Sequence, residues 1–209
     1  MKKILFIVLA FLFLVPACGK KQDGEKEASR ELPSAVNPYN TTSVFVQVKK
    51  KLENDPNNPK LWYHLADLYD RASLYEQEIE ALKKAVQLKP DMGYAYFRMG
   101  TAYNRLQKYK EAIEAFKKCI EIMPTFPVAY NNMAYAYGKL GMLKEKITAL
   151  EKAVQLRPTY STARLNLGLA YLEAGQIDKA KKQYEELTQI HEQFARELLK
   201  RINEKGGIS

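Results

Sequence analysis

Two cysteines and two histidines are the side chains of this 209-residue sequence that could act as nucleophiles, bases or soft metal ligands: Cys18, Cys119, His64 and His191. They lie far apart, and none has a neighbour at the spacing of a metal site. The sequence also lacks a nucleophile elbow, a phosphate-binding glycine loop and an HExxH motif. We therefore predict no enzyme, no metal and no cofactor. We expect His64 on a helix surface and Cys119 in the core.

Cys18 stands in a context that predicts covalent modification. Lys2 and Lys3 precede an unbroken apolar run of 12 residues, Ile4 to Val15. A membrane-spanning helix needs about 20 residues, so this run is typical of a signal peptide. The following Val-Pro-Ala-Cys resembles the lipobox of bacterial lipoproteins. This resemblance implies a signal peptide over residues 1–17, acylation of Cys18 and anchoring to a membrane of the cell envelope. The alternative is a plain secretory signal with an incidental cysteine.

The segment after Cys18 has the composition of a linker. Lys20 to Ser34 contains no aromatic residue and mixes both charge signs. Such a segment cannot bury enough apolar surface to fold. We therefore expect residues 18–39 to form a flexible tether between the membrane and a folded body.

A period of 34 residues organises the rest of the chain. Tyrosines recur at 69, 103, 137 and 171, and prolines at 56, 90, 124 and 158. Within each unit apolar residues recur at spacings of three and four, which predicts two amphipathic helices, and the proline ends the second one. One helix pair cannot cover its own apolar face. Stacking of successive pairs buries that face and gives a solenoid.

The repeated pattern W-x2-L-[GA]-x2-Y is similar to the tetratricopeptide repeat. It is carried in this sequence by Trp62, Leu65, Ala66 and Tyr69 and by their equivalents in the later units. The resemblance implies an all-α, right-handed α-solenoid of helix-turn-helix repeats with a concave groove. Full repeats are expected at 59–92, 93–126, 127–160 and 161–194. A half-repeat helix is expected at 40–58, and a C-terminal capping helix and tail at 195–209.

Some positions depart from the pattern. Glu78 and Lys146 stand where the family has a small residue, and we expect both side chains to extend outward into solvent. In the fourth unit, Arg164 replaces the aromatic residue and Glu192 replaces the proline. Atypical residues of this kind are typical of a terminal repeat that caps a stack.

The end of the chain predicts a long helix. No glycine or proline lies between Gln176 and Lys205, and apolar residues keep a spacing of three and four throughout. We predict one nearly continuous helix from about Asp178 to about Glu204. Its distal apolar stripe would cover the end of the stack or pair with a second copy in a homodimer.

Apolar side chains that the repeat does not require mark the expected binding site. The resemblance implies that the second, fifth, ninth, twelfth and thirteenth positions of each first helix face the groove. Large apolar residues at these positions are Tyr63, Tyr94, Phe97, Tyr135, Leu165, Leu169 and Leu172. Exposed aromatic residues in a groove are typical of binding surfaces, and we expect neither Phe97 nor Tyr135 to belong to the core between helices. The alternative is that the aromatic residues pack on one another and on arginine stems.

Charged residues lie beside these aromatic residues of the predicted groove. Arg71, Arg105 and Lys139 hold the thirteenth position in three successive units, and Arg98 lies about two helical turns before Arg105. Asp67 occupies the ninth position of the first unit, where the carboxylate-clamp subfamily has asparagine, so an acidic chaperone tail is not implied. We expect a partner segment with apolar anchors and some acidic residues.

These features predict a membrane-anchored scaffold or assembly factor of the bacterial cell envelope that binds protein partners in the groove. It resembles lipoproteins that serve envelope machines, including type IV pili and secretins. The alternative is a carrier of a small apolar ligand, which a closed, deep pocket would favour. The 33 Lys and Arg against 24 Asp and Glu give a net charge of +9, but no dense basic stripe, so no nucleic-acid partner is expected.

Overall fold

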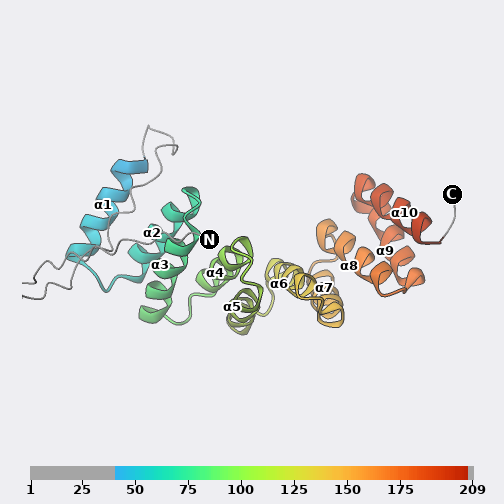
Figure 1. The fold of residues 1–209 in the computed structure, drawn as a ribbon, viewed down its shortest axis with the longest axis horizontal. Helices are drawn as coiled ribbons and strands as arrows, with labels where there is room; N and C mark the ends of the chain where they lie inside the picture. Colours follow the sequence, from blue (N-terminus) through green and yellow to red (C-terminus); the bar gives the residue numbers. More distant parts are fainter. Residues whose placement is uncertain (1–40, 207–209) are drawn as a thin grey trace, which may run out of the picture. The chain divides into compact units, whose positions relative to one another are not determined.

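The computed structural model describes residues 41–206, which form ten α-helices and no strand (Figure 1). This confirms the predicted all-α solenoid. The predicted signal peptide, Cys18 and the tether lie outside the described residues. The helices are α1 (Thr41–Asn54), α2 (Pro59–Arg71), α3 (Tyr75–Leu88), α4 (Gly93–Arg105), α5 (Tyr109–Ile122), α6 (Pro127–Lys139), α7 (Leu143–Leu156), α8 (Ser161–Glu173), α9 (Ile177–Ile190) and α10 (Glu192–Gly206).

Helices α2 to α9 form four pairs, each with a first helix of 13 residues and a second helix of 14. One residue with a positive φ angle closes the turn inside every pair: Ser73, Gln107, Gly141 and Gly175. Glycine adopts this left-handed conformation freely, whereas a residue with a Cβ atom is strained in it by about 1 kcal/mol. The turn geometry therefore repeats even where the residue type does not.

The turn that precedes a first helix is closed by the fourth residue of that helix in α2, α6 and α8. The Trp62 indole donates to the Pro56 carbonyl at 2.8 Å, and the Tyr130 hydroxyl donates to the Pro124 carbonyl at 3.3 Å. In the fourth pair Arg164 replaces the aromatic residue, and its Nε donates to the Pro158 carbonyl at 2.7 Å. Arg164 therefore makes the same hydrogen bond as the aromatic residue that it replaces.

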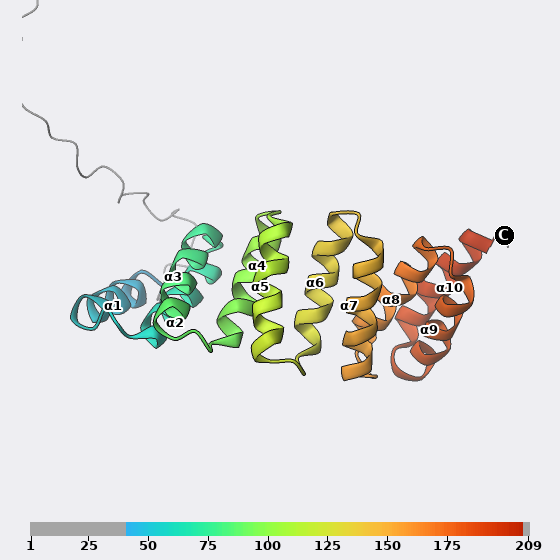
Figure 2. The same cartoon turned by 90° about the horizontal axis from the view of Figure 1, so that it is seen from below.

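The pairs follow one another in sequence order along the stack (Figure 2). Each second helix packs against the first helix of the next pair, and α4 also packs directly against α6. Within residues 41–206, no two second helices pack against each other as α4 packs against α6. Around α5, the first helices therefore lie closer together than the second helices do.

The core lies between the helices and is built from one repeated set of positions. Leu82, Phe116 and Leu150 are 34 residues apart and fully buried. A Cβ atom at Gly100 would come within 2.7 Å of the Phe116 ring, so the small residue lets the two helices of the pair approach closely. Cys119 is fully buried, as predicted, and burial raises the pKa of its thiol to about 11, so the thiol stays protonated at neutral pH. His64 is exposed, also as predicted.

The prediction of one continuous C-terminal helix is wrong. The chain is extended at His191, with φ −161° and ψ 86°, and α10 begins at the next residue. The His191 Nδ1 accepts from the Phe194 amide at 3.3 Å, and the two rings stack 3.9 Å apart. These contacts cap α10 although neither glycine nor proline is present.

Helix α10 packs against both α8 and α9 and closes the end of the stack. Ala195, Leu198 and Ile202 are buried there, and the Leu198 side chain occupies the space over Gly168. Of the two predicted roles for this apolar stripe, covering the end of the stack or pairing with a second copy, the structure therefore shows the first.

The prediction that Glu78 and Lys146 extend into solvent is also wrong. Glu78 is buried, and Lys146 crosses Gly138 to bring its Nζ within 2.6 Å of Glu173 in α8. Both residues occupy the same repeat position on a second helix. A side chain there points toward the first helix of the next pair, so a charged residue fits when that helix offers the opposite charge.

Candidate partner-binding face

The first helices form the surface on which the binding residues were expected, and we call it the first-helix face. Its most exposed aromatic side chains are Tyr94, 59% exposed, and Tyr135, 51% exposed. The Tyr94 ring meets Phe126 edge-on at 5.5 Å, and the Tyr135 ring meets Tyr109 edge-on at 6.2 Å. The two rings are thus held on rigid helices with much of their surface free for contact.

Other aromatic and aliphatic residues of the expected site are part of the packing between helices. The Phe97 ring lies 5.9 Å from that of Phe116 and 5.0 Å from that of Phe126, and Leu165 is buried. The expectation that Phe97 lies outside the core is therefore wrong, because the fifth position points into the contact with the second helix. Tyr63 is half-buried.

Arg98 is held inside an ion-pair cluster between the first and second pairs. Its Nη1 lies 3.1 Å from Asp67, and its Nη2 lies 3.1 Å from Glu78 and 3.6 Å from Asp70. The guanidinium group also lies 5.3 Å from the centre of the Tyr63 ring. Only 15% of the Arg98 side chain is exposed, so Arg98 joins two repeats instead of standing free at the rim.

The basic column of Arg71, Arg105 and Lys139, at the thirteenth position of successive first helices, is largely neutralised in the first two pairs. Arg71 pairs with Asp67 at 2.9 Å, and Arg105 pairs with Asp70 while its guanidinium group lies over the Tyr75 ring. Lys139 differs, because it has no ion pair within residues 41–206 and its ammonium group lies 5.3 Å from the Tyr135 ring centre. The uncompensated charge of the column therefore lies in the third pair.

A cavity of about 300 Å³ adjoins Lys139, between α6, α7 and α8. Its lining combines apolar, amide and cationic groups: Tyr135, Leu169, Asn131, Asn166, Lys139 and Lys146. The structure therefore brings together Tyr135, Lys139 and Leu169, which the sequence predicted separately. A ligand that fits this lining carries an apolar group next to a carboxylate.

Asparagines link three first helices beside this cavity, and the sequence analysis missed them. Asn166 donates to Asn131 at 3.0 Å, Asn131 donates to Asn132 at 3.3 Å, and Asn104 donates to the Asn132 carbonyl at 3.2 Å. Asparagine is unfavourable inside helices because its side chain competes for backbone hydrogen bonds. Two adjacent asparagines within a helix were the signal that could have revealed this ladder.

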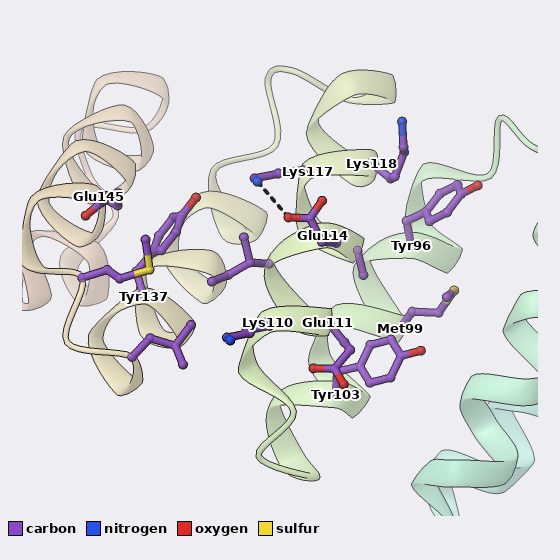
Figure 3. A pocket seen from close by; sticks show the side chains of 14 residues that line it. Tyr96, Met99, Tyr103, Lys110, Glu111, Glu114, Lys117, Lys118, Tyr137 and Glu145 are labelled. Atoms are coloured by element: carbon purple, nitrogen blue, oxygen red, sulfur yellow. Dashed lines mark hydrogen bonds and ion pairs between the residues drawn. The ribbon is translucent and has the colours of Figure 1, made fainter.

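A second cavity, of about 670 Å³, lies on the opposite face around α5 (Figure 3). Its apolar floor includes Tyr96, Tyr103 and Tyr137, and lysines and glutamates surround it. Two of the charged residues already neutralise each other, since Lys117 lies 2.8 Å from Glu114. This cavity is an open depression, whereas a closed, deep pocket would favour an apolar-ligand carrier.

The described residues contain no group of three or more His, Cys, Asp or Glu side chains placed to hold a metal ion. In the same part of the chain, no helix has the length and apolar character that a membrane crossing demands.

Stacked helix pairs with a 34-residue period and exposed aromatic residues on their first helices define a helical-repeat scaffold. Models of the tetratricopeptide repeat match residues 59–92 and 127–160, residues 93–126, and residues 147–201. The chain belongs to the tetratricopeptide repeat family. Proteins of this family are generally non-enzymatic scaffolds that bind other proteins.

Solved structures show the same fold. The chain is similar to MamA at 29% identity and a TM-score of 0.70, over 75% of this chain and 91% of MamA. It is similar to YrrB, described as a TPR protein with an unusual peptide-binding site, at 20% identity and a TM-score of 0.63, over 76% and 91% of the two chains. PilW, described as a widely conserved type IV pilus biogenesis factor, shares 20% identity at a TM-score of 0.66, over 81% and 80%. A comparison with curated protein sequences gives no match.

Proposed function

We propose that this protein is a lipid-anchored scaffold or assembly factor of the bacterial cell envelope that binds a protein segment on its first-helix face. The observation that carries the proposal is the exposure of Tyr94, Tyr135 and Lys139 on rigid helices, with Tyr135 and Lys139 lining one cavity. Large rings lose little conformational freedom on binding, so they are effective anchors. The peptide-binding site named for YrrB and the pilus role named for PilW support this class of function.

The chemistry of the face defines the segment that it binds. Tyr94 and Tyr135 offer two apolar contacts, and Lys139 offers a cation without a carboxylate partner in the described part of the chain. Asn131 and Asn166 line the adjacent cavity and hydrogen-bond to each other there. The partner segment therefore carries apolar side chains and at least one acidic residue.

Replacing both exposed tyrosines tests this proposal. Loss of one aromatic anchor weakens binding by about 2 kcal/mol or more, so Tyr94→Ala with Tyr135→Ala is expected to reduce partner affinity by about a thousandfold. The melting temperature should change little, because about half of each ring is already in solvent. The partner is identified by crosslinking the anchored wild-type protein in its membrane, and its affinity is then measured for each variant.

The matched control removes apolar surface elsewhere. Val46 on α1 is 61% exposed, and Met142 is 36% exposed and lines the cavity around α5. Neither lines a cavity with Tyr94 or Tyr135. The variant Val46→Ala with Met142→Ala should keep the partner. If the tyrosine variant binds as tightly as this control, the first-helix face is not the binding site.

Lipid anchoring is tested at Cys18, which lies outside the described residues. The short apolar run and the small residue before Cys18 support acylation of this thiol. Cys18→Ser is expected to remove the acyl mass and release the protein from the membrane fraction, as measured by mass spectrometry and fractionation. Cys119→Ala is the control, because Cys119 is buried and this variant should remain acylated. An unmodified Cys18 in the mature wild-type protein would refute the anchor.

A further inference from the structure

Three carboxylates converge on one guanidinium group at the junction of the first two repeats. Asp67 and Asp70 reach Arg98 from α2, and Glu78 reaches it from α3. Glu78 is only 2% exposed. Its Oε1 accepts from Arg98 at 3.2 Å, whereas its Oε2 is buried without a hydrogen-bond partner among the described residues. A buried carboxylate with one unsatisfied oxygen is poorly stabilised as an anion.

The charges around Glu78 set the net charge of this part of the first-helix face. Helices α2 and α4 pack against α3. Helix α2 contributes Asp67, Asp70 and Arg71, and α4 contributes Arg98 and Arg105. With Glu78 ionised, three carboxylates balance three guanidinium groups. A proton on Glu78 leaves the cluster with one positive charge.

We propose that the Glu78 carboxyl group is a proton-binding site that couples pH to the charge of the first-helix face and to the stability of the first repeat junction. Its effect on partner binding rests on the proposed function, whereas its effect on stability does not. The unsatisfied oxygen can carry the proton while Asp67 and Asp70 keep Arg98 in place.

Burial raises the pKa of Glu78 from 4.5 to about 7, and the negative charge of Asp70 acts in the same direction. Arg98 and Arg105 favour the anion and oppose this increase. The folded chain then binds the proton about 300-fold more tightly than the unfolded chain. Because the folded pKa is the higher one, the stabilisation is complete below pH 4.5 and is lost as the pH rises through 7.

The first test measures the titration of Glu78 directly. In the mature chain labelled with ¹³C, the Glu78 carboxyl signal is expected to titrate with a midpoint near pH 7. Between pH 8 and pH 5 the unfolding equilibrium constant should fall by about a hundredfold more in wild type than in Glu78→Gln. Glu80→Gln is the matched control, because Glu80 is exposed and pairs with Lys83, and it should keep the wild-type pH dependence. A Glu78 midpoint near 4.5 would overturn the proposal even if Glu78→Gln fails to fold.

The second test measures the coupling to the face with an aspartate-rich peptide as the probe. Aspartates stay ionised at pH 6 and pH 8, so a change in affinity reports on the protein. Wild type is expected to bind the peptide about fivefold more tightly at pH 6, and Glu78→Gln to show a smaller gain. An equal gain in wild type and in Glu78→Gln would overturn the coupling, as would equal wild-type affinities at the two pH values. Absence of binding at both pH values, with Glu78 titrating near 7, would contradict the proposed function and leave the proton site standing.

Discussion

Arg98→Met is expected to lower the free energy of unfolding by about 3–5 kcal/mol, because it leaves buried Glu78 without a counter-charge. Asp67 and Asp70 lose a shared partner in the same variant. The effect should be greatest at pH 8, where Glu78 is ionised. Urea denaturation followed by circular dichroism gives the measurement, and the loss should shrink as the pH falls through 7.

Two further variants separate burial from charge. Replacing both partners, as in Glu78→Leu with Arg98→Met, should restore most of the lost stability, since apolar side chains of similar volume fit the same space. Arg71→Met removes an exposed arginine that pairs with Asp67 and should change stability by less than about 1 kcal/mol. A loss of that small size in Arg98→Met would show that the cluster does not hold the repeats together.

Leu198→Ala is expected to lower the free energy of unfolding by about 2–5 kcal/mol and to detach α10 from the stack. Leu198 is fully buried, and its side chain fills the space over Gly168. Because terminal elements of a solenoid are held by one neighbouring unit only, the loss should be local. Amide hydrogen exchange should therefore accelerate in α10 while α4 to α7 remain protected.

Leu199→Ala is the matched control, since Leu199 is the adjacent leucine and is only half-buried. It should have a smaller effect on α10. If the amides of α10 stay as protected in Leu198→Ala as in wild type, the helix is held by other contacts and its role as the end cap is refuted.

The candidate site was predictable from sequence only where exposure follows from position within one helix. Tyr94 and Tyr135 were correctly expected to be exposed, because the second and ninth positions of a first helix lie outside its buried stripe. Phe97 was misplaced because the fifth position lies at the edge of that contact, where the neighbouring Phe116 and Phe126 decide the burial. The asparagine ladder was missed because its hydrogen bonds join different helices.

The sequence by itself determined the all-α fold, the 34-residue unit and the buried state of Cys119. Each of these follows from the spacing of apolar and small residues along a helix, and that spacing is a local property. The spacing did not predict the break at His191, because apolar residues keep a helical spacing on both sides of it, in α9 and in α10.

Only the tertiary structure decided which charges meet. Glu78 pairs with a residue 20 positions away, and Lys146 with one 27 positions away. Sequence spacing suggested that both side chains lie in solvent, because an unpaired charge is too unfavourable to bury. In both cases, the first helix of the following pair carries the opposite charge and packs against this side chain. The physical reason for the difference is that helix formation depends on neighbours within a few residues, whereas burial of a charge depends on a partner that folding brings from another repeat.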